Sequence, residues 1–255
     1  MNKSATVCVL VAAIALAGLA QELKPEDVLE GTAAAAKSYL RDTTELPLQV
    51  ATTTTEHDAA GKLRKTRRDR HRFTIVQARP SEYKSRNQVS FGTFVFHHQS
   101  MIEQIDADIT AIAAGMLLRP DVRQGFDFQI SRPGEHPLFR VSYQSHPGCG
   151  FEINSRHLKL RNWCGKGEYA VEPGSYALVG FTFEAAGTPA PVLEGRTLRS
   201  YRVEESFQTI TVPGVAKPFV VPKTIVTTYE DEKGKTILTS EFTLMPEEAG
   251  KKDSP

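Results

Sequence analysis

From Gly125 onward, this sequence consists almost entirely of short segments rich in β-branched and aromatic residues, separated by turn residues. Near the middle of the run, the stretch from Cys149 to Cys164 (CGFEINSRHLKLRNWC) has the pattern of two strands folded back on each other, with a cysteine at each end. Strands that follow one another through short turns form antiparallel sheets. The chain is therefore restricted to a mainly antiparallel β-architecture.

The first two expected strands form a long hairpin around the turn residues His57 to Gly61, because the Thr- and Val-rich segment before this turn favours extended structure. The full set of expected strands is Leu46–Glu56, Lys62–Gln77, Gln88–His98, Phe126–Ser131, Phe139–Gln144, Phe151–Asn154, Leu158–Trp163, Ser175–Ala185, Leu198–Pro213, Pro218–Tyr229 and Thr236–Leu244.

Two helices are expected. Pro25–Leu40 begins with proline and two acidic residues, which suit the first turn of a helix. Ser100–Leu118 begins with the capping box of Ser100 and Glu103. The second helix carries an apolar stripe at helical spacing, which either covers a core or acts as a lid that lines an apolar cavity: Ile102, Ile105, Ile109, Ile112 and Met116. The predicted fold class is α+β, mostly antiparallel β, as a curved sheet or half-open barrel with both helices packed on one face.

The N-terminus has the features of an export signal. Lys3 precedes an apolar run from Ala5 to Ala17, and Gly18 and Ala20 are the small residues that a signal peptidase needs. Cleavage is expected between Ala20 and Gln21, and an uncleaved anchor is the alternative. The mature chain is then one β-rich domain, 21–245, with a disordered polar tail, 246–255. It has no other apolar run long enough to span a membrane, so a periplasmic or secreted location is predicted.

The charge balance excludes one class of partner. The formal net charge is +1 at pH 7, and export separates the protein from the nucleic acid of its own cell. Nucleic acid is therefore not an expected partner.

Two of the three cysteines, Cys149 and Cys164, remain after cleavage at Ala20. An exported protein with two cysteines most simply forms one disulfide. A tight turn at Asn154–Ser155 would place Cys149 opposite Leu160. Pairing of Cys149 with Cys164 needs a wider loop centred on Arg156 and His157, or a link to the segment after the strand.

The same region contains the side chains of a zinc site, namely His146, Cys149, His157 and Cys164. This arrangement requires reduced cysteines in an oxidising compartment, so the disulfide is favoured over the metal. The sequence contains no other catalytic or phosphate-binding motif. No catalytic residue, metal or cofactor is predicted.

Basic residues are concentrated in the second strand of the long hairpin. One interpretation is an anion-binding face that includes Arg64, Arg67 and Arg70, which would bind lipid headgroups or an acidic polysaccharide. The other interpretation is a charged edge strand that prevents edge-to-edge pairing, which is the commoner use of such charges.

The order of these segments resembles a known family. An export signal, then a helix of the type PEDVLEGTAAAAKSYL, then a hairpin with a basic return strand (ATTTTEHDAAGKLRKTRRDRHRF) is similar to the periplasmic lipoprotein-carrier (LolA-like) superfamily. The segment SYRVEESFQTITVPGVAKPFVVPKTIVTTYEDEKGKT resembles its later strands. The resemblance implies an unclosed β-barrel wrapped around helices, with an apolar cavity for acyl chains, and binding rather than catalysis. No functional residue is carried over.

Three functional hypotheses follow. The first is an exported bacterial non-enzymatic protein that binds a lipid, a lipoprotein or another apolar ligand in the concave face of its sheet. The second is a module that recognises an envelope partner or polysaccharide through the basic strand 62–72. The third, and weakest, is a zinc-dependent enzyme.

Overall fold

The structure is a computed structural model of the 255-residue chain. It describes residues 23–40, 45–77, 88–91, 94–98, 123–131, 137–147, 153–154, 159–162, 164–186, 189–193, 195–211 and 218–245. The expected signal peptide, the helix Ser100–Leu118 with its five apolar residues, and the tail 246–255 lie outside the described residues.

The first expected helix is present as α2 (Pro25–Leu40). Its acidic residues Glu26 and Asp27 lie in the first turn, and Asp27 Oδ2 accepts a hydrogen bond from the backbone N–H of Lys24 at 3.2 Å. Both interactions stabilise the start of a helix. Val28 and Leu29 are fully buried, and the helix contacts strands at two places in the sheet.

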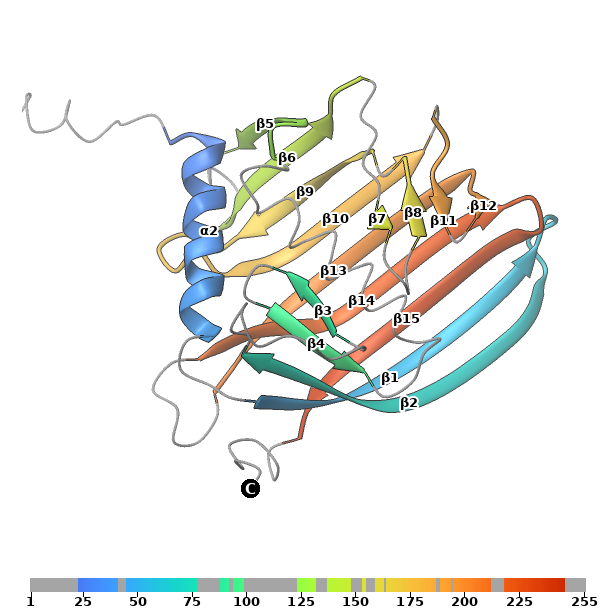
Figure 1. The fold of residues 1–255 in the computed structure, drawn as a ribbon, viewed down its shortest axis with the longest axis horizontal. Coiled ribbons are helices and arrows are strands. Elements are labelled where there is room, and N and C mark those ends of the chain that lie inside the picture. Colours follow the sequence, from blue (N-terminus) through green and yellow to red (C-terminus); the bar gives the residue numbers. More distant parts are fainter. Residues whose placement is uncertain are drawn as a thin grey trace, which may run out of the picture.

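The described strands form two sheets (Figure 1). The large sheet has eleven strands in the order β3-β4-β2-β1-β15-β14-β13-β10-β9-β6-β5, and the small one has the order β12-β11-β8-β7. The strand bounds are β1 Glu45–Asp58, β2 Leu63–Gln77, β3 Gln88–Phe91, β4 Phe94–His98, β5 Phe126–Ser131, β6 Phe139–Ser145, β7 Ile153–Asn154, β8 Lys159–Arg161, β9 Lys166–Val171, β10 Leu178–Ala186, β11 Val192–Leu193, β12 Arg196–Thr197, β13 Ser200–Ile210, β14 Phe219–Asp231 and β15 Gly234–Leu244.

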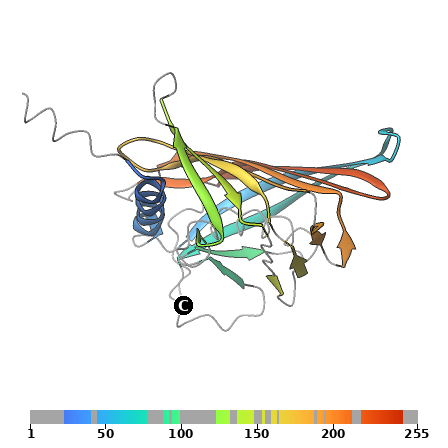
Figure 2. The same cartoon turned by 90° about the horizontal axis from the view of Figure 1, so that it is seen from above.

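The pairings are antiparallel and the large sheet is open, since its terminal strands β3 and β5 do not pair with each other. The predicted antiparallel class is therefore confirmed, with an unclosed sheet rather than a complete barrel. Figure 2 shows α2 and the small sheet on the same side of the large sheet. We call this side the covered face and the opposite side the outer face.

The long N-terminal hairpin is confirmed. β1 pairs with β2 from Glu45 to His57, and on its other edge it pairs with β15. The turn is held by Asp58, whose Oδ1 accepts hydrogen bonds from the N–H groups of Ala60 (3.0 Å) and Lys62 (2.9 Å). Gly61 has φ of 81°, a conformation that glycine adopts without strain.

The observed strands differ from the expected ones in detail. The segment Gln88–His98 is not one strand, because β3 and β4 pair with each other in antiparallel fashion, with Phe91 opposite Phe94. Gly92 stands between them in the sequence and is a typical hairpin residue. β9, which lies between β6 and β10, was not predicted at all. Its glycines and charged residues have low strand propensity, so the local sequence does not predict a strand.

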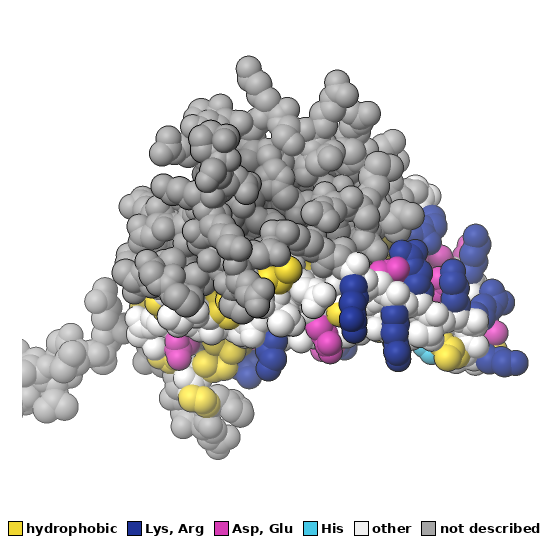
Figure 3. Space-filling view, turned by 90° about the horizontal axis from the view of Figure 1, so that it is seen from below, with side chains coloured by type: hydrophobic (Ala, Val, Ile, Leu, Met, Phe, Trp, Pro, Cys, Tyr) yellow, Lys and Arg dark blue, Asp and Glu magenta, His cyan; other side chains and the backbone are white. Residues whose placement is uncertain are grey.

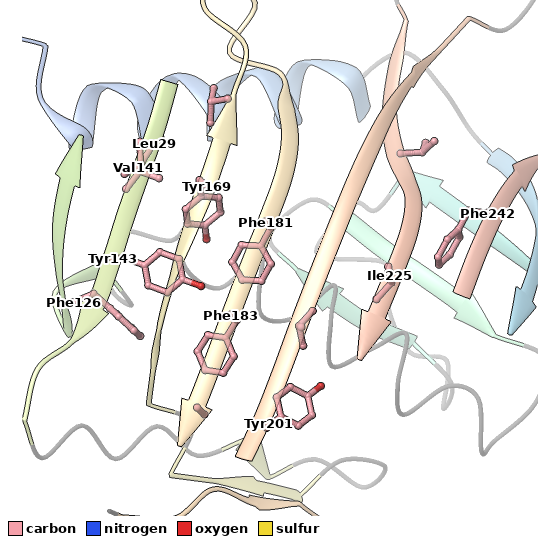
Figure 4. Packing of buried hydrophobic residues seen from close by; sticks show 14 of the residues in the cluster. Leu29, Phe126, Val141, Tyr143, Tyr169, Phe181, Phe183, Tyr201, Ile225 and Phe242 are labelled. Atoms are coloured by element: carbon pink, nitrogen blue, oxygen red, sulfur yellow. The ribbon is translucent and has the colours of Figure 1, made fainter. Parts of the chain in front are cut away.

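The core lies on the covered face of the large sheet. Buried aromatic and aliphatic side chains alternate along the strands with exposed polar ones, as in β6, where Val141 and Tyr143 are buried and Ser142 is exposed. Figure 4 shows this packing from β5 to β15, with Leu29 of α2 against it. The face is therefore apolar over most of the width of the sheet.

Candidate functional site

An aromatic cluster occupies the covered face between β5 and β10. Tyr169 lies with its ring centroid 5.5 Å from that of Tyr143 and 5.1 Å from that of Phe181. Tyr143 stacks on Phe181 at 6.1 Å with an interplanar angle of 12°, and Phe126 meets Tyr143 edge-on at 5.9 Å. Each such pair contributes about 0.5–1.5 kcal/mol beyond the burial of its area. The cluster is thus a closely packed, buried part of the hydrophobic core.

Gly167 lets β9 and β10 approach closely at this cluster. A Cβ atom at this position would collide with the carbonyl oxygen of Thr182 and with the hydroxyl of Tyr143. The Tyr143 hydroxyl donates a hydrogen bond to the same carbonyl, so its one polar atom is satisfied. The glycine therefore makes room for the aromatic ring beside it.

Glu205 interrupts the apolar face near its centre. It lies on β13 directly opposite Phe181 of β10 on one side and Ile225 of β14 on the other. Its side chain is only 5% exposed, and its Oε1 atom has no hydrogen-bond partner. Because directly opposite residues point to the same face, this carboxyl group projects among the buried apolar side chains.

Burial raises the pKa of Glu205 well above its ordinary value. The pKa of Tyr169 is also raised, first by burial and then by the negative charge of Glu205, while Arg123 acts in the opposite direction. Burial, Tyr169 and Glu205 together raise the pKa of Tyr143. The three acids therefore favour their neutral forms, in which each can donate a hydrogen bond inside an apolar environment.

Arg123 adds a cation to this part of the molecule. It stands at the start of the described segment 123–131, and its Nε atom is buried without a hydrogen-bond partner. Its positive charge partly offsets the rise in the pKa of Tyr169 that burial and Glu205 cause. Arg123 and Glu205 thus each leave a buried polar atom available.

Hydroxyl groups on β14, β15 and β1 add further polar atoms to the covered face. Ser240 of β15 lies opposite Ile225 on one side and opposite Thr52 of β1 on the other. The hydroxyls of Thr52 and Ser240 are 3.0 Å apart and form a hydrogen bond. Thr227 on β14 is buried as well. The covered face therefore combines a broad apolar area with a narrow row of polar groups.

The neighbouring carboxylates Glu204 and Glu205 point to opposite faces of the sheet, as successive residues of a strand do. Glu204 is exposed and forms an ion pair with Arg202 at 2.7 Å, whereas Glu205 is buried. The alternation of Tyr201, Val203 and Glu205 along one strand was the signal that could have placed the second carboxylate on the apolar face.

Cys164 is disulfide-bonded, whereas Cys149 lies outside the described residues. In the small sheet, Ile153 pairs with Leu160 and Asn154 with Lys159. This register is symmetric about Arg156 and His157, which is the wider loop that a Cys149–Cys164 pairing requires. The pairing itself stays a prediction.

The residues of the zinc alternative are not gathered in the described part. His146 Nε2 lies 3.0 Å from Asp127 Oδ1 on the neighbouring strand, and His157 lies outside the described residues. Cys164 is not available as a thiolate ligand because it is in a disulfide. Among the described residues, no three His, Cys, Asp or Glu side chains lie close enough together to bind a metal ion.

The three arginines of the anion-binding hypothesis are exposed but do not share one face. Arg67 lies opposite Thr54, and Arg70 lies opposite Ala51, so their side chains point to different sides of the sheet. Arg64 lies in an irregularity of the pairing near His57 and reaches Asp58 at 3.7 Å. The arginines therefore flank the strand rather than line one surface.

The outer face carries two shallow hollows of about 450 and 260 Å³. Both are lined by several charged side chains, and some of these pair with one another, for example Arg140 Nη1 with Glu168 Oε1 at 2.6 Å. Such a surface suits solvent better than an apolar ligand. The covered face is the better candidate site.

Comparisons with known proteins include a solved structure that aligns with most of this chain. No family model and no curated protein matches the chain. A domain from Vibrio parahaemolyticus assigned to the outer membrane lipoprotein-sorting proteins aligns with 90% of this chain and 96% of its own, at a TM-score of 0.43 and 9% identity. At these values the similarity says nothing about what this chain binds. Within the described residues, no helix is long and apolar enough to cross a membrane.

Proposed function

We propose that this chain is an exported, non-enzymatic protein that holds an amphiphilic ligand, such as a lipid or an acyl chain, against the covered face of its large sheet. The observation that carries this proposal is the carboxyl group of Glu205, which is buried in an aromatic surface with an Oε1 atom that has no hydrogen-bond partner. A ligand with an apolar body and a polar end would match both features.

The apolar body of the ligand would lie against the aromatic cluster. Tyr143, Tyr169 and Phe181 are at most 3% exposed, so they would support the site, and the ligand would contact partly buried apolar side chains packed against them, such as Phe128 and Ile130. Pockets of this kind bind ligands mainly through apolar contact and use a few polar groups for orientation.

The polar end would satisfy Glu205. A buried polar atom without a partner costs about 1–3 kcal/mol, and such atoms in natural proteins need an explanation. Because the pKa of Glu205 is raised by burial, its neutral carboxyl group can donate a hydrogen bond to an ester or carbonyl oxygen. The proposed ligand class is therefore an amphiphile with an uncharged oxygen-containing head.

The proposal includes export with cleavage between Ala20 and Gln21, and one disulfide between Cys149 and Cys164. N-terminal sequencing of protein exported by a bacterial host tests the cleavage. A chain that begins at Met1 and stays in the membrane fraction would contradict it.

The ligand proposal is tested with the same exported protein. Native mass spectrometry should show a co-purifying mass of lipid size, and monoolein should displace the fluorescent acyl probe cis-parinaric acid. If no lipid-sized mass co-purifies and the probe does not bind, the proposal is wrong.

Two leucine variants of the same strand locate the site. Glu205→Leu removes the buried carboxyl, and Glu204→Leu removes its exposed neighbour on the outer face. Loss of one hydrogen bond in a buried site predicts about tenfold weaker binding of monoolein to Glu205→Leu. Glu204→Leu should bind as the unchanged protein does. Equal affinities in both variants would place the ligand elsewhere.

A further inference from the structure

The edge of β2 is open over most of its length. β2 pairs with β1 from Leu63 to Val76, but β4 covers its other edge only from Phe73 to Gln77. Among the described residues, no strand pairs with this edge between Leu63 and Arg72. We call the part from Leu63 to Arg70, whose side chains are described, the basic edge. Its backbone N–H and C=O groups that point away from β1 form a template for a further strand.

Cations flank the basic edge on both sides. Arg68 and Arg70 lie opposite Thr53 and Ala51 and point to the outer face, whereas Lys65 and Arg67 point to the other side. All four are exposed. Figure 3 shows Lys and Arg side chains gathered over this end of the molecule, toward the turn between β1 and β2.

Local carboxylates neutralise only part of this charge. Asp69 Oδ2 lies 2.6 Å from Arg67 Nε, and Asp58 Oδ2 lies 3.7 Å from Arg64 Nε. Within the described part of the chain, Lys65, Arg68 and Arg70 form no ion pair at all. An exposed cation without a partner remains available to an incoming anion.

We propose that the basic edge binds an acidic polypeptide segment, which adds to β2 as a further antiparallel or parallel strand. Backbone hydrogen bonds to the open edge would supply affinity, as in other cases of β-strand addition. The acidic side chains of the added strand would alternate between its two faces, where they meet the cations on both sides of the edge. A sheet edge flanked by charges on both faces fits an extended chain.

The charge pattern of the basic edge favours an acidic extended segment over other partners. A second copy of this chain would bring the same cations against the same edge, and like charges placed directly opposite one another are unfavourable. A flat anionic bilayer would meet the cations of only one face at a time and would leave the backbone groups of the edge unpaired. An acidic extended segment satisfies the cations and the backbone together.

The experiment uses the exported full chain and a ten-residue peptide of alternating glutamate and threonine. Titration in a low-salt buffer should show saturable binding, and hydrogen exchange of the β2 amides should slow. The same peptide N-methylated along its central six residues keeps its charge but cannot form strand pairing. It should bind at least about tenfold more weakly. A peptide in which lysine replaces each glutamate should bind at least about tenfold more weakly as well.

Charge reversal on the protein supplies the matched control. Arg68→Glu with Arg70→Glu should weaken binding of the acidic peptide by about tenfold or more. Lys166→Glu with Lys223→Glu changes the net charge equally at exposed sites on β9 and β14, and should change the affinity by less than about twofold. Three results would overturn the proposal: no binding of the acidic peptide, equal binding of the N-methylated peptide, or binding only to phosphatidylglycerol vesicles.

Discussion

Glu205 lies directly opposite Phe181 in the pairing of β13 with β10, so that a carboxyl group and a phenyl ring project side by side from the covered face. On its other side, Glu205 faces Ile225. Neither neighbour can form a hydrogen bond with the carboxyl group. The protein thus keeps a titratable group where an apolar residue would give a more stable core.

The first prediction concerns the pH dependence of unfolding. The pKa of Glu205 is raised in the folded state by burial, so between the ordinary pKa of a glutamate and this raised value the folded state binds more protons than the unfolded state. Stability is therefore lost as pH rises through this window, by at most about 1.4 kcal/mol per pH unit from this group. Glu205→Gln should remove this slope.

Urea unfolding at a series of pH values from 4 to 8 measures the slope. Glu204→Gln on the outer face is the control and should keep the slope of the unchanged protein, because Glu204 is exposed. Identical slopes in the unchanged protein and Glu205→Gln would show that the carboxyl group is not held in an apolar environment.

The second prediction concerns the tyrosines of the cluster. Burial, together with the charge of Glu205, raises the pKa of both Tyr143 and Tyr169. At least two of the seven tyrosines should then stay protonated when the exposed ones ionise, and stability should fall as pH rises above about 10. Absorbance at 295 nm, followed against pH in the folded and urea-unfolded protein, measures the ionisation of the tyrosines. Tyr169→Phe should remove one late-titrating group.

Much of the fold could be predicted because it depends on local patterns. The hairpin of β1 and β2 follows from the turn residues around Gly61, and α2 follows from Pro25 and the acidic first turn. β9 could not be predicted from local patterns. Gly167 lowers its strand propensity, and the glycine is needed because β10 and Tyr143 pack closely against this position. Tertiary contacts decide such a segment.

The candidate site was harder to predict than the fold. The alternation of Tyr201, Val203 and Glu205 along β13 predicts that Glu205 shares a face with apolar residues, but it does not identify the side chains of other strands that surround the carboxyl group. The pairing with Phe181 and Ile225 settles this, and it joins residues about twenty positions apart. The basic edge could not be predicted either, because the strand order in the sheet decides which strand edges are left without a partner.

The third prediction concerns the close approach of β9 and β10. Gly167→Ala places a methyl group against the carbonyl oxygen of Thr182 and the hydroxyl of Tyr143, so strand separation or loss of the aromatic packing must follow. We expect a loss of about 3 kcal/mol or more in the free energy of unfolding. Gly180→Ala on β10 is the control, since its Cβ would meet its nearest neighbours at an ordinary 3.6 Å. Equal unfolding midpoints of the two variants would contradict the close approach.

The fourth prediction concerns the small sheet. Ile153 pairs with Leu160 and Asn154 with Lys159, and the same register continued outward would bring position 149 opposite position 164. Cys164 is disulfide-bonded, and once the predicted signal peptide is cleaved, Cys149 is the one other cysteine of the chain. Closing a loop of this size contributes about 3 kcal/mol in the chain-entropy model. Cys164→Ser should therefore lower the free energy of unfolding by about this amount.

Peptide mapping of the exported protein without reduction tests the connectivity directly. A single cross-linked peptide should contain both Cys149 and Cys164, and Cys8→Ser should leave the map and the stability unchanged, because residue 8 lies in the predicted signal peptide. Reduction of the unchanged protein should lower its unfolding midpoint to that of Cys164→Ser. A disulfide-linked dimer, or a free thiol at Cys149, would show that the register of β7 and β8 does not extend to the cysteines.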